Sequence, residues 1–161
     1  PCDGGYAVKI IGGSRDVTAG QLIDRIGVKL GIKFPCGAEL EKLANTFEGK
    51  LPKPKISVKD TFCNISGGEN LCEKLINENA PPSMTAAYLT EFIRLTLEKM
   101  TDNLLLNAKS NNIIFSGGVS SNKTLSEFMK KKYGAHCAEP QFSQDNAAGI
   151  ALLCMEKLND R

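Results

Sequence analysis

The sequence has no apolar run of the ~20 residues that a membrane-spanning helix needs. Its one histidine, His136, has no second histidine with which to form a metal pair, and its six cysteines lack the C-x-x-C spacing of a structural zinc site. No charged and apolar leader precedes a cleavage site, which predicts that a signal peptide is absent. The net charge of +2 argues against a surface dedicated to nucleic acid, although a local basic patch is compatible with it. The one basic cluster, Lys130–Lys132, lies at a predicted helix end, where cations suit the helix dipole.

Size and composition are those of an ordinary globular protein. The 161 residues fit a single domain or one lobe of a larger protein. Hydrophobic residues make up 42% and charged residues 24%, which are typical values for soluble domains. Several cysteines have apolar neighbours, as Cys154 does, which predicts buried and reduced thiols. Reduced thiols indicate a cytoplasmic location.

Strand-like and helix-like patterns alternate along the chain. Strands are expected over residues 6–11, 62–66, 113–116 and 135–138. Helices are expected over residues 17–30, 38–45, 69–78, 84–108 (with Ser83 as its N-cap), from Thr124 onward, and over 145–158. Residues 47–60, rich in proline and lysine, are expected to form an exposed loop. This order predicts an α/β fold in which helices flank a mixed sheet.

The most informative stretch runs from Asn111 to Asn122. Ile113 to Ser116 form an apolar run that predicts a fully buried strand, and the run ends at Gly117-Gly118 before the next helix. A strand, a glycine pair and a helix form a layout in which backbone N–H groups approach a ligand closely, because glycine has no Cβ. Asn122 either hydrogen-bonds such a ligand or caps the helix. On these residues alone, a tight turn with an N-cap is the favoured interpretation.

Four other residues have both a structural and a functional interpretation. Asp24 adjoins the apolar stripe of the helix over 17–30, so it is either a surface residue or a ligand acceptor. Gly37 allows the backbone to pass close to a neighbouring element or a ligand. Glu41 is by default a solvated helix residue, and Asp145 is suited to cap the last helix. None of these residues identifies a function by itself.

Four motifs taken together resemble one known family. They are Ser14 to Asp24 (SRDVTAGQLID), Phe34 to Gly37 (FPCG), Ser116 to Asn122 (SGGVSSN) and Gln144 to Ala148 (QDNAA). In this order they are similar to the TsaD family of threonylcarbamoyl-adenosine tRNA-modification enzymes, formerly called O-sialoglycoprotein endopeptidases or glycoproteases. The resemblance covers nearly the whole chain but only about the carboxyl-terminal half of the family's usual length. It implies a single partial domain over residues 1–161, the carboxyl-terminal lobe of an actin-like, sugar-kinase and Hsp70 ATPase (ribonuclease H-like) fold.

The resemblance implies a nucleotide site built by the first two helices. Asp24 would accept hydrogen bonds from the ribose hydroxyls of a bound adenylate. Gly37 would let the backbone pass against the nucleotide, and Glu41 would also reach the nucleoside. The ligand implied is ATP or threonylcarbamoyl-AMP.

The carboxyl-terminal motifs would complete that site. Gly117 and Gly118 would lie under the adenosine, and Asn122 would bond to its edge or to the phosphate side. Asp145 would be a ligand of the catalytic metal, which is iron or zinc in relatives. The implied reaction is transfer of a threonylcarbamoyl group from its AMP anhydride to N6 of adenosine 37 in tRNA, and a paralogous protein subunit is an implied partner.

Departures from the family pattern limit what the chain is expected to do alone. The family's metal-binding His-x-x-x-His helix and its phosphate-binding Ser-Gly-Gly loop have no counterpart here. Two acids of the first family motif are lost between Val17 and Gln21, and a basic residue of another motif becomes Glu69 or Asn70. We therefore expect the isolated chain to be catalytically inactive. The alternative is a degenerate paralogue that binds ATP or a partner protein; a metallopeptidase has little support, since no paired zinc ligands are present.

Overall fold

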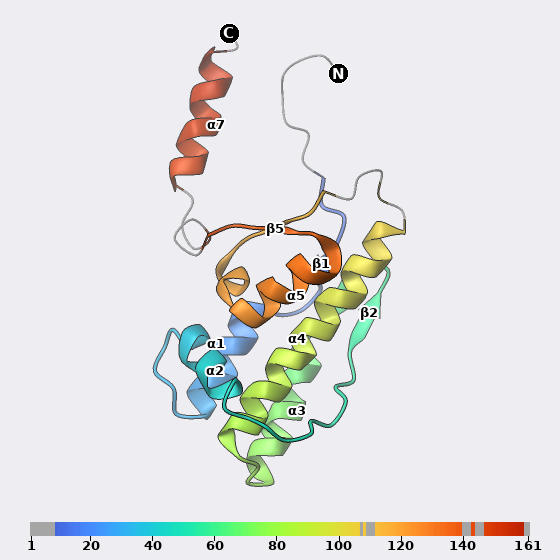
Figure 1. Ribbon diagram of the computed structural model, residues 1–161, viewed down its shortest axis with the longest axis vertical. Coiled ribbons are helices and arrows are strands. Elements are labelled where there is room, and N and C mark those ends of the chain that lie inside the picture. The colour runs from blue at the N-terminus through green and yellow to red at the C-terminus, as the bar shows by residue number, and fades with distance from the viewer. Residues whose placement is uncertain (1–8, 107, 109–111, 140–142, 144–146, 160–161) are drawn as a thin grey trace.

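The computed structural model describes residues 9–106, 108, 112–139, 143 and 147–159, excepting the side chains of 147, 148 and 157–159. The helices are α1 (Ala19–Lys29), α2 (Gly37–Ala44), α3 (Ser66–Asn77), α4 (Pro82–Leu105), α5 (Lys123–Tyr133) and α7 (Ala147–Asn159), with a 3-10 turn η1 (Gly118–Ser121). The strands are β1 (Gly13–Ser14), β2 (Ser57–Lys59), β3 (Phe62–Asn64), β4 (Ile114–Phe115) and β5 (His136–Cys137). Figure 1 shows α1, α2 and α3 gathered around the amino-terminal half of α4, with the strands and α5 nearer its other end.

Helix α1 forms where the sequence predicts a helix, and its start is fixed by a capping box. The Thr18 hydroxyl accepts a hydrogen bond from the Gln21 N–H, and the Gln21 side chain accepts one from the Thr18 N–H. Leu22, Ile23 and Ile26 are buried, which confirms the predicted apolar stripe. This stripe packs into one core with the buried face of α4, which consists of Ala86, Tyr88, Leu89, Phe92 and Ile93.

The long helix α4 begins one residue before its predicted N-cap. Pro81 is the cap and Pro82 the first helical residue, so the prediction of Ser83 as N-cap is wrong. Proline suits the first helical position because its missing N–H has no intrahelical partner there. None of the helices in the described ranges is both long and apolar enough to cross a bilayer.

The strands form two small sheets instead of one continuous mixed sheet. In the first, β3 lies between β1 and β2, pairing parallel with β1 and antiparallel with β2. The strand predicted over 6–11 is wrong where the structure describes it, because residues 9–12 are outside any strand and β1 comes after them. Gly12 passes so close to Thr61 that an added Cβ would lie 2.3 Å from the Thr61 carbonyl oxygen. Gly12, which has no Cβ, thus lets the chain approach the turn between β2 and β3 closely.

The stretch 47–60 is only partly the exposed loop that its composition predicts. Its last residues form strand β2, which pairs with β3. Pro54 is buried, and Ile56 and Val58 pack against the core, so the extended chain is attached to the body. The lysines occupy the alternate, outward-facing positions, so the composition of the segment predicts an exposed loop although its other side chains face the body.

The second sheet consists of β4 and β5, which pair in parallel. The prediction of a fully buried strand over 113–116 is wrong, because Ile114 is 78% exposed and burial alternates along the segment. A sheet of two short strands has only one face covered by the body, so alternate side chains remain in solvent. The apolar composition gave no means of distinguishing these two cases.

Helix α5 starts at Lys123 and ends at Tyr133, and its C-cap Gly134 adopts the left-handed conformation with φ of 64°. Lys130, Lys131 and Lys132 lie in its last turn, as predicted. The last helix, α7, extends away from the body in Figure 1, and Cys154 on it is exposed, contrary to the prediction of a buried thiol. Cys36, Cys63 and Cys72 are buried and free, as expected.

Candidate functional site

The side chain of Asp24 fixes the corner that leads into α2. Its Oδ1 accepts a hydrogen bond of 2.9 Å from the backbone N–H of Cys36, immediately before Gly37. The Cys36 thiol is completely buried and lies 3.5 Å from the Asp24 carbonyl oxygen. Burial, followed by the charge of Asp24, raises the pKa of that thiol, so it remains protonated at neutral pH. Asp24 therefore binds the residue immediately before Gly37, so these two predicted site residues lie close together.

Glu41 reaches from α2 to the start of α5. Its Oε1 accepts hydrogen bonds from the backbone N–H groups of Lys123 (2.7 Å) and Thr124 (3.3 Å). A carboxylate is favoured at this position because the N-terminus of a helix carries unpaired N–H groups and a partial positive charge. The prediction of a merely solvated helix residue is wrong, since Glu41 is an external cap that joins two helices 82 residues apart in sequence.

Asn122 is the N-cap of α5, as one of the two interpretations of the sequence proposed. Its Oδ1 accepts a hydrogen bond of 2.9 Å from the N–H of Leu125. This bond assigns the oxygen of the side-chain amide to the helix and leaves the Nδ2 group pointing elsewhere. Asn122 and Glu41 therefore stabilise the same helix end. Asn122 does so as the residue before α5, and Glu41 does so from α2.

The glycine turn before Asn122 has the backbone geometry that its composition predicts. Gly117 has φ of 102°, a conformation that residues with a Cβ rarely adopt. Its carbonyl accepts hydrogen bonds from the Ser120 N–H (2.9 Å) and the Ser120 hydroxyl (2.7 Å), which closes the turn. An added Cβ at Gly118 would have no neighbour within 4 Å, so one side of this turn is open space.

The six predicted nucleotide-binding residues lie at two places on contacting elements. Asp24 binds the residue before Gly37 at the α1–α2 corner, whereas Glu41 and Asn122 both cap the start of α5, near Gly117 and Gly118. Helix α1 contacts both α2 and η1, which carries Gly118 next to Gly117. No described hydrogen bond joins Asp24 to the glycine turn. A described pocket lies elsewhere, between α4, the residues before β1 and the β2–β3 turn, and is lined by Ile11, Gly12, Thr61, Leu97, Met100, Thr101 and Leu104.

Two of the departures from the family pattern have structural partners here. Gln21, which stands where the family has an acid, completes the capping box of α1. Glu69 lies 3.0 Å from Arg25 and 2.9 Å from Lys29, so it joins α3 to α1 through ion pairs. The Lys29 side-chain hydrogen bond, followed by that of Arg25, lowers the pKa of Glu69. In this chain Gln21 therefore stabilises the start of α1, and Glu69 attaches α3 to α1.

A metal site is not evident in the part of the chain that the structure describes. Asp145, the predicted metal ligand, lies outside the described residues. Within them, no three His, Cys, Asp or Glu side chains are close enough together to hold an ion. His136 is exposed on β5. The described residues do not fit a resident iron or zinc ion, and no chemical step is assigned to one.

Asp16 is a structurally important residue whose role the sequence did not reveal. Its Oδ1 accepts from the N–H groups of Val17 and Ile65 (2.8 and 2.9 Å) and from the Ser14 hydroxyl. Its Oδ2 accepts from the Ser66 N–H (3.0 Å) and hydroxyl (2.6 Å) at the start of α3. Burial raises the pKa of Asp16, but the hydrogen bonds from Ser66, Ile65 and Ser14 together lower it by more. The only signal in the sequence was the position of an acid just after a glycine pair.

Comparison with known proteins agrees with this arrangement of motifs. The family described as TsaD, tRNA N6-adenosine threonylcarbamoyltransferase, matches residues 2–152. Proteins named tRNA N6-adenosine threonylcarbamoyltransferase from Rickettsia canadensis (strain McKiel) and Rickettsia massiliae (strain Mtu5) are each 28% identical over 173 residues, covering 95% of this chain. The match covers 51% of the first relative and 50% of the second, so the chain spans about half the length of the curated relatives it matches. On the match over nearly all of its residues, the chain belongs to the TsaD family.

Proposed function

We propose that this chain is the nucleotide-binding lobe of an enzyme that transfers a threonylcarbamoyl group to N6 of an adenosine in tRNA. The observation that carries the proposal is that Glu41 and Asn122 both cap the start of α5, beside the open glycine turn. Family membership supplies the chemistry, since the matching family is named for this transfer. The lobe would belong to the actin-like, ribonuclease H-like fold, with which the described α/β body is compatible.

The described hydrogen bonds leave unused polar groups around the proposed adenosine site. Each of Asp24 and Glu41 uses only one carboxylate oxygen in the bonds that the described residues make. Asn122 uses only its oxygen. The free Asp24 oxygen would accept from the ribose hydroxyls, the free Glu41 oxygen would accept from the nucleoside, and the Asn122 Nδ2 group would donate to it. Gly117 and Gly118 would let the adenosine lie against the backbone.

The cofactors and partners follow from the same proposal. The nucleotide would be ATP or threonylcarbamoyl-AMP, the acceptor would be tRNA, and a paralogous subunit would be a partner. In the whole enzyme, Asp145 would be one ligand of an iron or zinc ion. This chain's own contribution is to bind and orient the nucleoside.

A degenerate paralogue that binds ATP or a partner protein without catalysis is the second candidate. The observation in its favour is the ion pairing of Glu69 with Arg25 and Lys29, since the family motif carries a basic residue at the position of Glu69 or Asn70. An acid in this position removes a cation that would contact phosphate or tRNA. Threonylcarbamoyl transfer by the longer protein, assayed on a tRNA transcript, separates the two candidates.

The test of the nucleotide site is calorimetric titration of ATP into the chain and two Asn122 variants. Asn122→Asp keeps an oxygen acceptor for the Leu125 N–H and removes the Nδ2 donor, whereas Asn122→Ser keeps a cap with a shorter side chain. We expect both variants to fold with stability within about 1 kcal/mol of the parent. We expect ATP binding to weaken at least about tenfold in both variants, because the loss of one hydrogen bond at a buried polar contact costs roughly 1.4 kcal/mol or more.

Undiminished ATP binding by Asn122→Asp would mean that the residue serves the helix alone. Thr18→Ser is the matched control, because it changes the N-cap of another helix, α1, and keeps the hydroxyl that accepts from the Gln21 N–H. If the parent chain itself binds no ATP, the motifs serve packing and capping here, and the second candidate function is favoured.

A further inference from the structure

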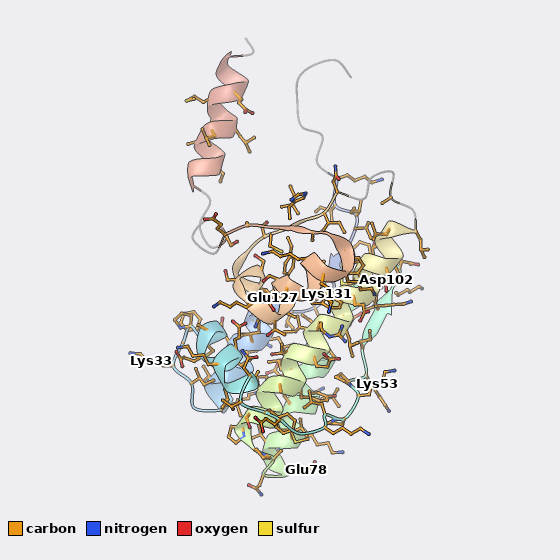
Figure 2. The ribbon with its side chains drawn as sticks, viewed as in Figure 1. Lys33, Lys53, Glu78, Asp102, Glu127 and Lys131 are labelled. Atoms are coloured by element: carbon orange, nitrogen blue, oxygen red, sulfur yellow. The ribbon has the colours of Figure 1, made fainter. Side chains whose placement is uncertain are left out.

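The extended segment that ends in β2 presents a regular row of cations to solvent. From residue 53 to residue 59, burial alternates strictly. The inward positions are Pro54, Ile56 and Val58, and the outward positions are Lys53, Lys55, Ser57 and Lys59. Alternate residues of an extended chain are about 7 Å apart, so the row formed by Lys53, Lys55 and Lys59 (the lysine row) spans about 20 Å. Figure 2 shows Lys53 pointing away from the body into solvent.

A further cation, Arg15, lies on the same face of the sheet, on the other side of β3. Lys59 pairs directly with Phe62, while the neighbouring Cys63 is buried on the opposite face. The Arg15 guanidinium lies over the Phe62 ring, 5.1 Å from its centroid. Arg15 therefore lies two strands away from the lysine row and on its side of the sheet, next to an aromatic ring.

These four cations are not neutralised by the rest of the described chain. Among residues with described positions, no carboxylate lies within 4.0 Å of Lys53, Lys55, Lys59 or Arg15, whereas Lys29, Lys42 and Lys132 all form ion pairs. Two acids are near in sequence. Asp16 is already occupied by its hydrogen-bond donors, and Asp60 lies exposed at the turn after β2. The face consequently has a net positive charge although the whole chain has only +2.

We propose that the lysine row and Arg15 bind the phosphate backbone of RNA. A line of exposed cations about 20 Å long fits a linear polyanion better than a single small anion. The choice of RNA rests on the proposed function, in which tRNA is the acceptor. Lysines on an edge strand also have a purely structural role, because they discourage strand-to-strand association. The experiment below separates the two roles.

The test measures binding of a fluorescein-labelled tRNA transcript by anisotropy across a NaCl series. The test variant is the full 161-residue chain with Lys53→Gln, Lys55→Gln and Lys59→Gln. The matched control removes the same charge with Lys33→Gln, Lys130→Gln and Lys131→Gln, three exposed lysines on other elements. We expect the test variant to bind at least about tenfold more weakly and the slope of log K against log[salt] to fall by about 2–3, while the control stays within about twofold of the parent.

Equal weakening in both variants would show that net charge alone binds RNA, and would overturn the proposal. Unchanged RNA binding by the test variant would also overturn the proposal, whether or not sedimentation shows that the variant self-associates. This is the outcome expected if the lysines only prevent strand-to-strand association. Binding of phosphatidylserine vesicles in preference to RNA would overturn it as well. ATP titration of the same two variants keeps the proposals distinct: selective loss of RNA binding supports the lysine row even if no variant binds ATP.

Discussion

At the scale of single residues, Asp16 shows how one carboxylate can join two distant parts of a chain. It accepts hydrogen bonds from the residues after β1 and from the first residues of α3, nearly 50 positions away. Its contribution resembles that of an N-cap, with the difference that the acceptor comes from a distant segment. Its removal should therefore loosen the junction of β1 with α3 and leave the nucleotide-site residues in place.

We predict that Asp16→Asn lowers the free energy of unfolding at pH 7 by about 1–2 kcal/mol, the range for loss of a capping carboxylate. The folded-state pKa of Asp16 is lowered, so its stabilisation is present above the unfolded-state value of about 3.9 and is lost as the pH falls below it. The parent should thus lose stability between about pH 5 and pH 3 more steeply than the variant. Urea unfolding at several pH values measures this.

Asp60→Asn is the control for that experiment. The Asp60 backbone carbonyl, not its carboxylate, accepts the described hydrogen bond from Asn103. Asparagine also tolerates the positive φ of 56° at this position. Parallel acid profiles for the parent and Asp16→Asn would contradict the assigned role of the carboxylate.

At the scale of elements, α1 and α2 are held together by a contact that only glycine permits. A Cβ on Gly27 would lie 2.3 Å from the Cβ of Cys36, which is completely buried. Alanine favours a helix over glycine by about 1 kcal/mol, yet the clash is with atoms next to the backbone, which cannot move without shifting the α2 corner. Overpacking of this kind costs about 1–3 kcal/mol.

We predict that Gly27→Ala lowers the melting temperature of the chain although it improves helix propensity. Gly20→Ala is the matched control in the same helix, because a Cβ there would have no neighbour within 4 Å. That variant should be neutral or more stable by up to about 1 kcal/mol. Thermal unfolding of both variants, followed by circular dichroism, gives the comparison; a Gly27→Ala chain as stable as Gly20→Ala would refute the close contact.

The helices could be predicted from the sequence better than the strands, for a physical reason. The helices α1 to α5 repeat their apolar positions over two or more turns, so the pattern specifies them, as Leu22, Ile23 and Ile26 do for α1. The strands are two or three residues long and owe their position to pairing partners, so Gly13–Ser14 carried no strand signal at all. The N-cap role of Asn122 was foreseen because capping is local. The role of Glu41 was not, since its partners lie in a helix far along the chain.

At the scale of the whole molecule, the family's site is only partly contained in the described chain. The motifs predicted to face the adenosine lie on contacting elements, whereas the described residues offer no metal-binding cluster and the chain spans about half the length of its curated relatives. We predict that the 161-residue chain alone transfers no detectable threonylcarbamoyl group to a tRNA transcript. Radiolabelled threonine incorporation measures this, with a full-length relative as positive control. Transfer by the chain alone would show that residues outside the described set complete the site.

The hydrogen bonds in the first turn of α5 also limit how an anion can bind there. Its four backbone N–H groups already have acceptors, namely Glu41 for Lys123 and Thr124, and the side chain and carbonyl of Asn122 for Leu125 and Ser126. A phosphate at this helix end would compete with the Glu41 carboxylate for the same donors and would be repelled by it. A phosphate bound to these N–H groups would therefore displace Glu41 and break the hydrogen bonds that attach α2 to α5. A nucleotide that leaves the two helices joined must direct its phosphates away from α5.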